Sequence, residues 1–186
     1  MPRLWSATIQ EHRSDVLDAI LDATAQLVHR DGASKLTMTS LANAAGVGRA
    51  TLYKYVPDTE SAIRSWQERE MARHLVQLRG IATASEAGSR LESVLEAYVN
   101  IRRHRHEDAQ GLHGADRLAP VEAELRDLVR ELIEEDRAAG RVRTDVPADQ
   151  LAAFAVASAG AAPHMPGSNA AKTLAALIVQ TLGAHS

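Results

Sequence analysis

Residues Thr37 to Tyr55 read TMTSLANAAGVGRATLYKY, and this stretch decides the fold. Its first part favours a short helix that is capped by Thr37 or Thr39 and ends at Gly46, where glycine allows a sharp exit. Its second part predicts another short helix, which ends before Pro57 because a residue preceding proline is pushed away from helical angles. Two short helices joined by a tight turn form a helix-turn-helix, whose second helix enters the DNA major groove.

The second of these helices carries side chains suited to DNA. We expect Arg49, Thr51 and Tyr53 to read bases, since arginine can bond guanine O6 and N7 and a tyrosine ring can lie against a thymine methyl. Lys54 and Tyr55 lie further along, where phosphate contacts are expected, and the preceding helix N-terminus offers N–H groups to a phosphate oxygen. The predicted DNA-binding residues are Thr37, Thr39, Gly48, Arg49, Ala50, Thr51, Tyr53, Lys54 and Tyr55.

Local charge supports a surface that meets phosphates. Residues 32–57 contain Lys35, Arg49 and Lys54 but no Asp or Glu, although the whole chain has a formal net charge of −3. Phosphate attraction depends on where the cations lie rather than on the total charge. Spacing alone leaves one alternative open, a helical hairpin in which Gly46 is only a helix C-cap.

Composition favours an ordinary all-α protein. The 186 residues are 45% hydrophobic and contain no cysteine, which excludes disulfides and thiolate chemistry. Alanine and leucine abound, and no alternating β-branched run of strand length occurs. No apolar stretch of about 18 residues predicts a membrane span, and the start lacks the apolar core of a secretory signal. We therefore expect a cytoplasmic protein.

The remaining helices follow from apolar spacing, capping residues and prolines. They are expected over about residues 14–30, 58–79, 89–106, 120–140, 147–162 and 168–182. Small and polar residues from Ile81 to Gly88 suggest a boundary. We predict a helix-turn-helix DNA-binding domain over residues 1–60, a connecting helix over 58–79, and a helical domain over 80–186.

The chain resembles the TetR (tetracycline repressor-like) family of transcriptional regulators. Leu41-Ala42, Ala45-Gly46-Val47 and Thr51-Leu52-Tyr53 with Tyr55 fall in register with the DNA-binding signature of that family, and the resemblance covers about residues 13–73. It implies an all-helical subunit with an N-terminal three-helix DNA-binding domain. It also implies a C-terminal ligand-binding and dimerisation domain, and a repressor that a small-molecule inducer releases from its operator.

Three positions depart from the family pattern. Gly48 stands where serine is usual, so a hydroxyl cap is missing at little cost. Val56 replaces the commoner phenylalanine, and Thr59 stands where many members have a phosphate-binding lysine. We expect the loss of this lysine to lower the salt dependence of DNA binding slightly.

The last two helices suggest a homodimer. They carry Leu151, Phe154, Leu177 and Leu182 among small residues that allow close helix approach. We expect a four-helix bundle with a second copy, largely because of the resemblance, and hence a palindromic double-stranded operator. The alternative is that these helices only complete the core of one subunit.

A small-molecule pocket is expected among the C-terminal helices, with each candidate lining residue also a candidate core residue. The candidates are Trp66, His74, Tyr98, His113, Phe154 and Met165. Aromatic residues are only 3% of the chain, so a flat aromatic ligand would find few stacking partners. We predict no cofactor and no metal, because arginines flank His104 and His106 and these two point roughly 200° apart on a helix.

No enzyme signature is present: the sequence has no phosphate-binding glycine loop, no HExxH motif and no nucleophile–base–acid set. We therefore predict a DNA-binding regulator rather than an enzyme. Two alternatives stay open, namely a helical protein-interaction module and a regulator without a small-molecule ligand.

Overall fold

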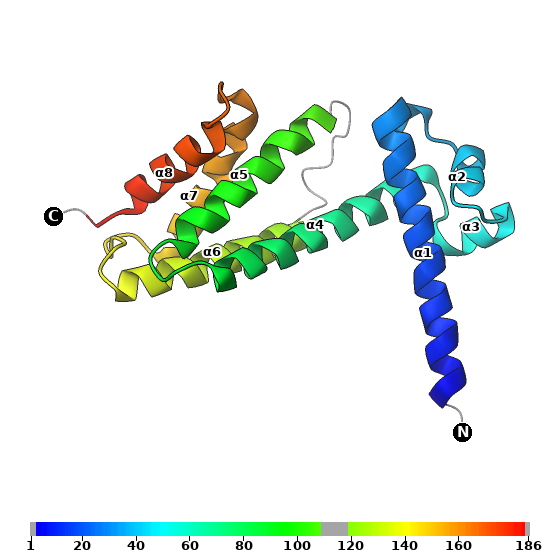
Figure 1. Cartoon of the computed structure of the whole chain (residues 1–186), viewed down its shortest axis with the longest axis horizontal. Helices are drawn as coiled ribbons and strands as arrows, with labels where there is room; N and C mark the ends of the chain where they lie inside the picture. The colour runs from blue at the N-terminus through cyan, green and yellow to red at the C-terminus, as the bar shows by residue number, and fades with distance from the viewer. Residues whose placement is uncertain (1–2, 109–118, 185–186) are drawn as a thin grey trace. The chain divides into compact units, whose positions relative to one another are not determined.

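The computed structural model describes residues 3–108 and 119–184, so His113 lies outside the described residues. Figure 1 shows the helices in chain order. They are α1 (Arg3–Asp31), η1 (Ala33–Lys35), α2 (Met38–Ala44), α3 (Arg49–Tyr55), α4 (Thr59–Ala84), α5 (Arg90–Asp108), α6 (Ala119–Ala138), α7 (Ala148–Ser158), η3 (Ala159–His164) and α8 (Ala170–Leu182).

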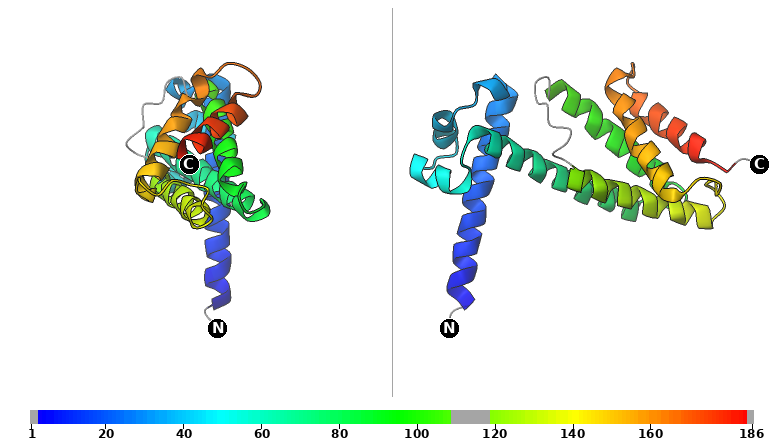
Figure 2. Two further views of the ribbon diagram at one scale, coloured as in Figure 1. Left: turned by 90° about the vertical axis from the view of Figure 1, so that its left-hand side faces the viewer. Right: turned by 180° about the vertical axis from the view of Figure 1, so that it is seen from behind.

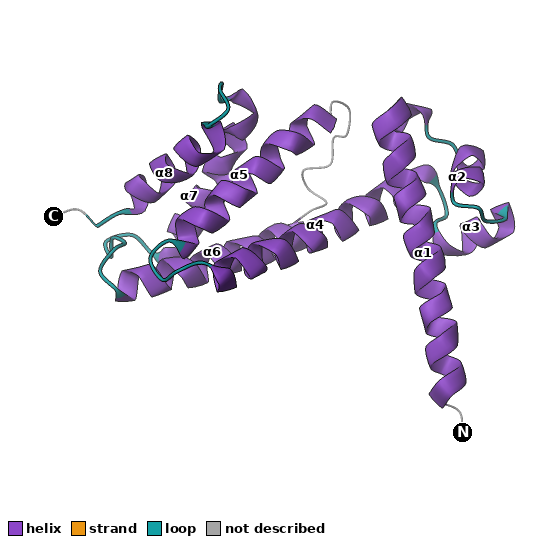
Figure 3. Ribbon diagram, viewed as in Figure 1, coloured by secondary structure: helices purple, strands orange, loops and turns teal. Residues whose placement is uncertain are grey.

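The predicted all-α class is confirmed. Figure 3 colours the described chain as helix and loop, and the β-pairing within it is an isolated bridge between Val142 and Gly183. In the part of the chain that the structure describes, no helix is long and apolar enough to cross a membrane.

The chain divides into two compact units, residues 1–70 and residues 71–186, called here the N-terminal and C-terminal units. The continuous helix α4 supplies its first part to the N-terminal unit and the rest to the C-terminal unit. The predicted domain limits at residues 60 and 80 stay a prediction.

The N-terminal unit has its own core, formed where α1, α2, α3 and the start of α4 meet (Figure 1). Helical spacing brings one apolar face of each helix inward. The fully or nearly fully buried side chains include Ile20, Leu21, Leu27, Val28, Leu41, Leu52, Val56, Ala62 and Trp66. This core holds the two short helices in place, because a helix of seven residues is not stable by itself in water.

The two long helices α1 and α4 extend beyond their predicted limits. Helix α1 begins at Arg3 rather than near Ser14, and no glycine or proline interrupts its 29 residues. Helix α4 continues past Arg79 to Ala84, into the segment expected to be a boundary. Alanine and leucine are strong helix formers, and a single exposed glycine costs too little to stop such a helix.

The C-terminal unit buries a second and larger core. Helix α6 packs against α7, and α5 packs against α8 and η3. Figure 2 shows α8 beside α5. Its largest fully buried side chains are Leu78, Leu91, Val94, Leu95, Val99, Val129, Ile133 and Leu182.

The penultimate helix is shorter than predicted. It ends at Ser158 instead of Ala162, and the chain continues as the 3₁₀ helix η3 through His164. Pro163 lies inside η3, where its missing N–H cannot support an α-helical hydrogen bond. The last helix begins at Ala170 rather than Ser168.

Candidate nucleic-acid interface

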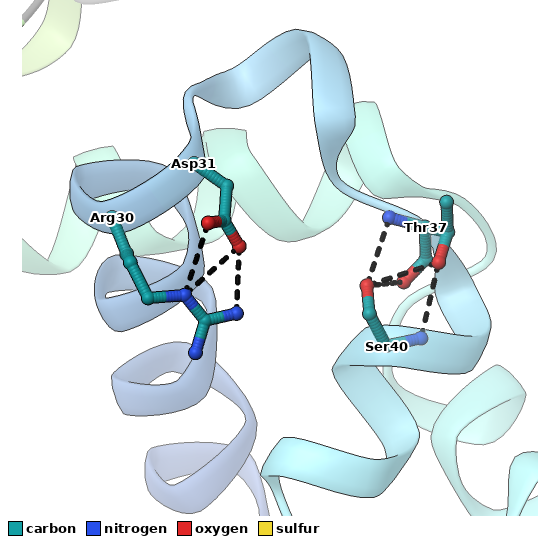
Figure 4. A network of polar contacts seen from close by, with 4 residues as sticks. All are labelled: Arg30, Asp31, Thr37 and Ser40. Atoms are coloured by element: carbon teal, nitrogen blue, oxygen red, sulfur yellow. Dashed lines mark hydrogen bonds and ion pairs between the residues drawn. The ribbon is translucent and has the colours of Figure 1, made fainter.

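The N-terminus of α2 is held by a reciprocal pair of hydroxyl contacts. The Ser40 backbone N–H donates to Thr37 Oγ1 at 3.1 Å, and the Thr37 backbone N–H donates to Ser40 Oγ at 3.1 Å. This capping box satisfies two of the N–H groups that a helix start leaves unpaired (Figure 4). Thr37 is thus confirmed as the N-cap, and Thr39 lies exposed in the first turn.

The turn between α2 and α3 depends on glycine. Gly46 has a φ of +66°, which L side chains rarely adopt. The Val47 N–H donates to the Ala42 carbonyl at 3.0 Å, and the Gly46 N–H donates to the Asn43 carbonyl at 3.3 Å. These two bonds form a Schellman motif, which ends α2 and turns the chain towards α3.

Of the seven residues of helix α3, one packs into the core and most of the others are exposed to solvent. Leu52 is its fully buried side chain, with 0% of its surface exposed. Arg49, Ala50 and Lys54 are exposed, and Tyr53 keeps 47% of its surface in contact with solvent. The helix therefore presents most of its side chains outward while one leucine anchors it to the core.

Three other residues that were predicted to bind DNA, Gly48, Thr51 and Tyr55, differ in how far they are exposed to solvent. Gly48 is the N-cap of α3 with φ −67° and ψ 145°, and it provides no side-chain hydrogen bond. Thr51 is half-buried, and Tyr55 is half-buried because it packs against the core of the N-terminal unit. Tyr55 thus has less surface to offer to DNA than Tyr53.

The carboxylates that flank this segment are engaged locally. Asp31 accepts hydrogen bonds from Arg30, whose Nη2 lies 2.6 Å from Oδ2, and this contact lowers the pKa of Asp31 (Figure 4). Asp58 accepts the Ser61 backbone N–H at 2.7 Å as the predicted cap of α4, and that bond lowers the pKa of Asp58. Residues 32–57 between them remain free of acidic side chains.

One arginine that sequence reasoning missed links α4 to α1 inside the N-terminal unit. Arg69 donates to Asp18 Oδ1 at 3.0 Å and also to Asp22, and its side chain is only 14% exposed. Burial opposes the charge of Arg69, but the two carboxylates outweigh that effect and raise its pKa. The sequence feature that could have indicated a partner for Arg69 is the acidic face of α1, with aspartates at 15, 18 and 22.

The C-terminal unit contains a small apolar cavity between α4, α5 and α6. Its lining residues are Met71, His74, Leu75, Leu78, Tyr98, Ile101, Arg102 and Leu125. Of the predicted pocket residues, His74 and Tyr98 therefore lie together. Two sequence features could have indicated other lining residues, namely the apolar spacing of α4 for Met71, Leu75 and Leu78, and the basic run at Arg102-Arg103 for Arg102.

The other pocket candidates lie elsewhere. Trp66 belongs to the core of the N-terminal unit, where its ring packs edge-on against the His29 ring with the two ring centroids 5.4 Å apart. Phe154 is 44% exposed on α7, and Met165 packs against the C-terminal core just after η3. The pocket assignment as a whole stays a prediction.

A capped first helix, a glycine turn and an outward-facing second helix define a helix-turn-helix DNA-binding protein. Residues 20–61 match the model of the family described as bacterial regulatory proteins, tetR family. Residues 20–61 therefore carry a DNA-binding domain of the kind found in this family, and the chain is a DNA-binding transcriptional regulator. A comparison with curated proteins found no match.

Solved structures share the fold over nearly the whole chain. A TetR/AcrR-family regulator from Thermobifida fusca is 17% identical with a TM-score of 0.70, over 89% of this chain and 95% of that one. RolR in complex with resorcinol is 19% identical with a TM-score of 0.66, over 94% and 91% of the two chains. FadR from Bacillus subtilis in complex with stearoyl-CoA is 11% identical with a TM-score of 0.66, over 92% and 97%.

Proposed function

We propose that this regulator is a homodimeric repressor, which binds a palindromic operator through α3 and is released by a small molecule bound in the C-terminal unit. The observation that carries the DNA-binding part is the exposed face of α3, with Arg49 and Tyr53 outward in a segment free of carboxylates. Such a face meets the requirement for base contacts in a major groove that phosphates line.

The DNA contacts divide into base reading and phosphate binding. Arg49, Thr51 and Tyr53 read base edges, and Gly48 and Ala50 let the helix approach the groove closely because their side chains are absent or small. The phosphate contacts are assigned to Thr37, Thr39, Lys54 and Tyr55. Base contacts set the preferred sequence, whereas phosphate contacts position the protein and make binding depend on salt.

Selection of bound DNA from a random pool tests this proposal. A palindrome with half-sites about one helical turn apart is expected for a dimer with two recognition helices. Arg49→Ala should weaken operator binding by about 1–3 kcal/mol and relax the preference at one base pair. Arg126→Ala is the matched control, because it removes the same charge from an exposed position of α6. If wild type and Arg49→Ala both bind every DNA sequence equally well, Arg49 does not read a base.

The dimer proposal rests on exposed apolar side chains of the last two helices. Phe154 on α7 is 44% exposed and Leu177 on α8 is 50% exposed. Burying such side chains against a second copy removes apolar surface from water. Sedimentation should give a dimer that Leu177→Glu dissociates, whereas Val76→Glu should not, since Val76 is 72% exposed on α4. A wild-type monomer at micromolar concentration contradicts the proposal.

The release by a small molecule is supported by the fold and by the cavity. RolR was solved with resorcinol and the Bacillus subtilis FadR with stearoyl-CoA, so proteins of this fold hold quite different small molecules. In this chain the cavity between α4, α5 and α6 is the candidate site for such a small molecule. The test is a screen for compounds that dissociate the selected operator, and a compound that binds without changing operator affinity is not an inducer.

A further inference from the structure

The cavity of the C-terminal unit combines apolar walls with a single arginine. Helix α4 contributes Met71, Leu75 and Leu78, α5 contributes Ile101 and α6 contributes Leu125. These side chains suit an aliphatic body, which gains free energy by leaving water. The remaining lining residues are His74, Tyr98 and Arg102.

Arg102 differs from the arginine next to it. Arg103 donates to the Gly167 carbonyl at 3.2 Å. Arg102 makes no hydrogen bond or ion pair to residues 13–103 and 122–184, the ranges whose side chains the structure describes, and it is half-buried at the cavity. Its Nη2 lies 3.6 Å from the position that a Cβ would take at Gly160, so the guanidinium lies against the backbone of η3. A half-buried cation gains from an anion that replaces its lost water.

We propose that the cavity binds an aliphatic carboxylic acid, with the carboxylate on Arg102 and the hydrocarbon chain between α4, α5 and α6. The guanidinium can hold both carboxylate oxygens in parallel hydrogen bonds, which favours this group over a neutral one. The low aromatic content of the lining favours an alkyl chain over a flat aromatic ring. The inference deepens the proposed release by a small molecule and rests on it for its regulatory meaning.

The ligand must widen the cavity as it enters. The free volume is about 10 Å³, close to that of one water-sized sphere, whereas ligand pockets commonly hold about 300–1,000 Å³. Met71 is the most adaptable wall because its unbranched side chain has three rotatable bonds. Leu75 and Leu78 belong to α4, which also supplies Ala62 and Trp66 to the core of the N-terminal unit. Displacing them therefore acts on a helix shared with the DNA-binding unit.

The test measures binding to the full chain without DNA, by calorimetry. The probes are octanoate, decanoate and dodecanoate, each compared with the alcohol and the amine of the same length. Wild type should bind the acid at least about tenfold more tightly than the alcohol, since a hydrogen bond to a charged group contributes about 1.5–3 kcal/mol. Arg102→Gln should abolish this difference, Arg102→Lys should retain part of it, and Arg126→Gln should leave it unchanged.

Two outcomes overturn the proposal, namely no binding of any of the three acids and equal binding of acid and alcohol. Loss of helicity in Arg102→Gln is checked by circular dichroism, and Arg102→Lys then carries the comparison. Operator binding is measured separately with the same variants. Failure of the ligand proposal leaves operator binding intact, whereas failure of the DNA-binding proposal leaves the acid–alcohol difference intact, so the two failures are distinguishable.

Discussion

Replacing Gly46 by alanine tests whether the turn of the helix-turn-helix depends on backbone conformation alone. A Cβ added at this position meets no heavy atom within 4 Å, so the substitution causes no clash. Its φ of +66° nevertheless lies in the left-handed region, where L residues are disfavoured by about 1–2 kcal/mol. We expect Gly46→Ala to lower the free energy of unfolding of the N-terminal unit by that amount.

Gly80→Ala is the matched control for the same chemical change. Gly80 lies in the interior of α4, is exposed, and a Cβ there also meets no heavy atom within 4 Å. Alanine is favoured over glycine inside a helix by roughly 0.5–1 kcal/mol. We therefore expect Gly80→Ala to stabilise the C-terminal unit, so that one added methyl group has opposite effects at the two positions.

Amide hydrogen exchange followed separately in the two units is the appropriate assay, because it reports local opening free energies rather than one average. The Val47 N–H, which donates to the Ala42 carbonyl, reports on the turn directly. The reasoning is refuted if Gly46→Ala exchanges as slowly as wild type, or if Gly80→Ala speeds exchange in α4. Either result would mean that local backbone preference does not control these sites.

Three further variants test the packing and charges described above. Arg69→Met should lower the stability of the N-terminal unit by about 1 kcal/mol in urea unfolding, since it removes a partly exposed two-carboxylate network, and unchanged stability contradicts that role. Leu95→Ala should cost the C-terminal unit about 2–5 kcal/mol, because Leu95 is fully buried, and a loss below 1 kcal/mol would contradict its core role. The hydrogen bond from Ser61 lowers the pKa of Asp58, so the ionised carboxylate stabilises the fold. This contribution is fully present at a pH above the ordinary aspartate pKa, and it is lost as the pH falls through the lowered pKa. Asp58→Asn should remove this acid-dependent part of the unfolding curve, and identical pH profiles for variant and wild type would refute it.

Local features of the DNA-binding unit could be predicted from the sequence because short-range chemistry decides them. A threonine before an apolar run, a glycine after it and a proline beyond the next helix each act within a few residues. They predicted a cap at Thr37 or Thr39, the turn at Gly46 and the end of α3 before Pro57. The structure has the cap at Thr37, and it contains the turn and the helix end as predicted.

Features that depend on distant partners could not be predicted in this way. Arg69 and Asp18 are 51 residues apart, and no local pattern joins them. The half-buried state of Tyr55 depends on the core against which it packs, while Tyr53 two residues earlier points outward. The cavity needs three helices to meet, so only His74 and Tyr98 were among the predicted residues that line it.

The separation of roles along α3 has a consequence for how this protein can change. Leu52 anchors the helix, whereas the exposed neighbours on either side of it contribute little to the core. Exchanges at Arg49, Ala50 and Tyr53 should therefore cost the fold almost nothing, and under the base-reading role proposed above they would alter which DNA sequence is bound. A laboratory library confined to these three codons should consist mainly of folded proteins, among which the proposed role predicts new operator preferences.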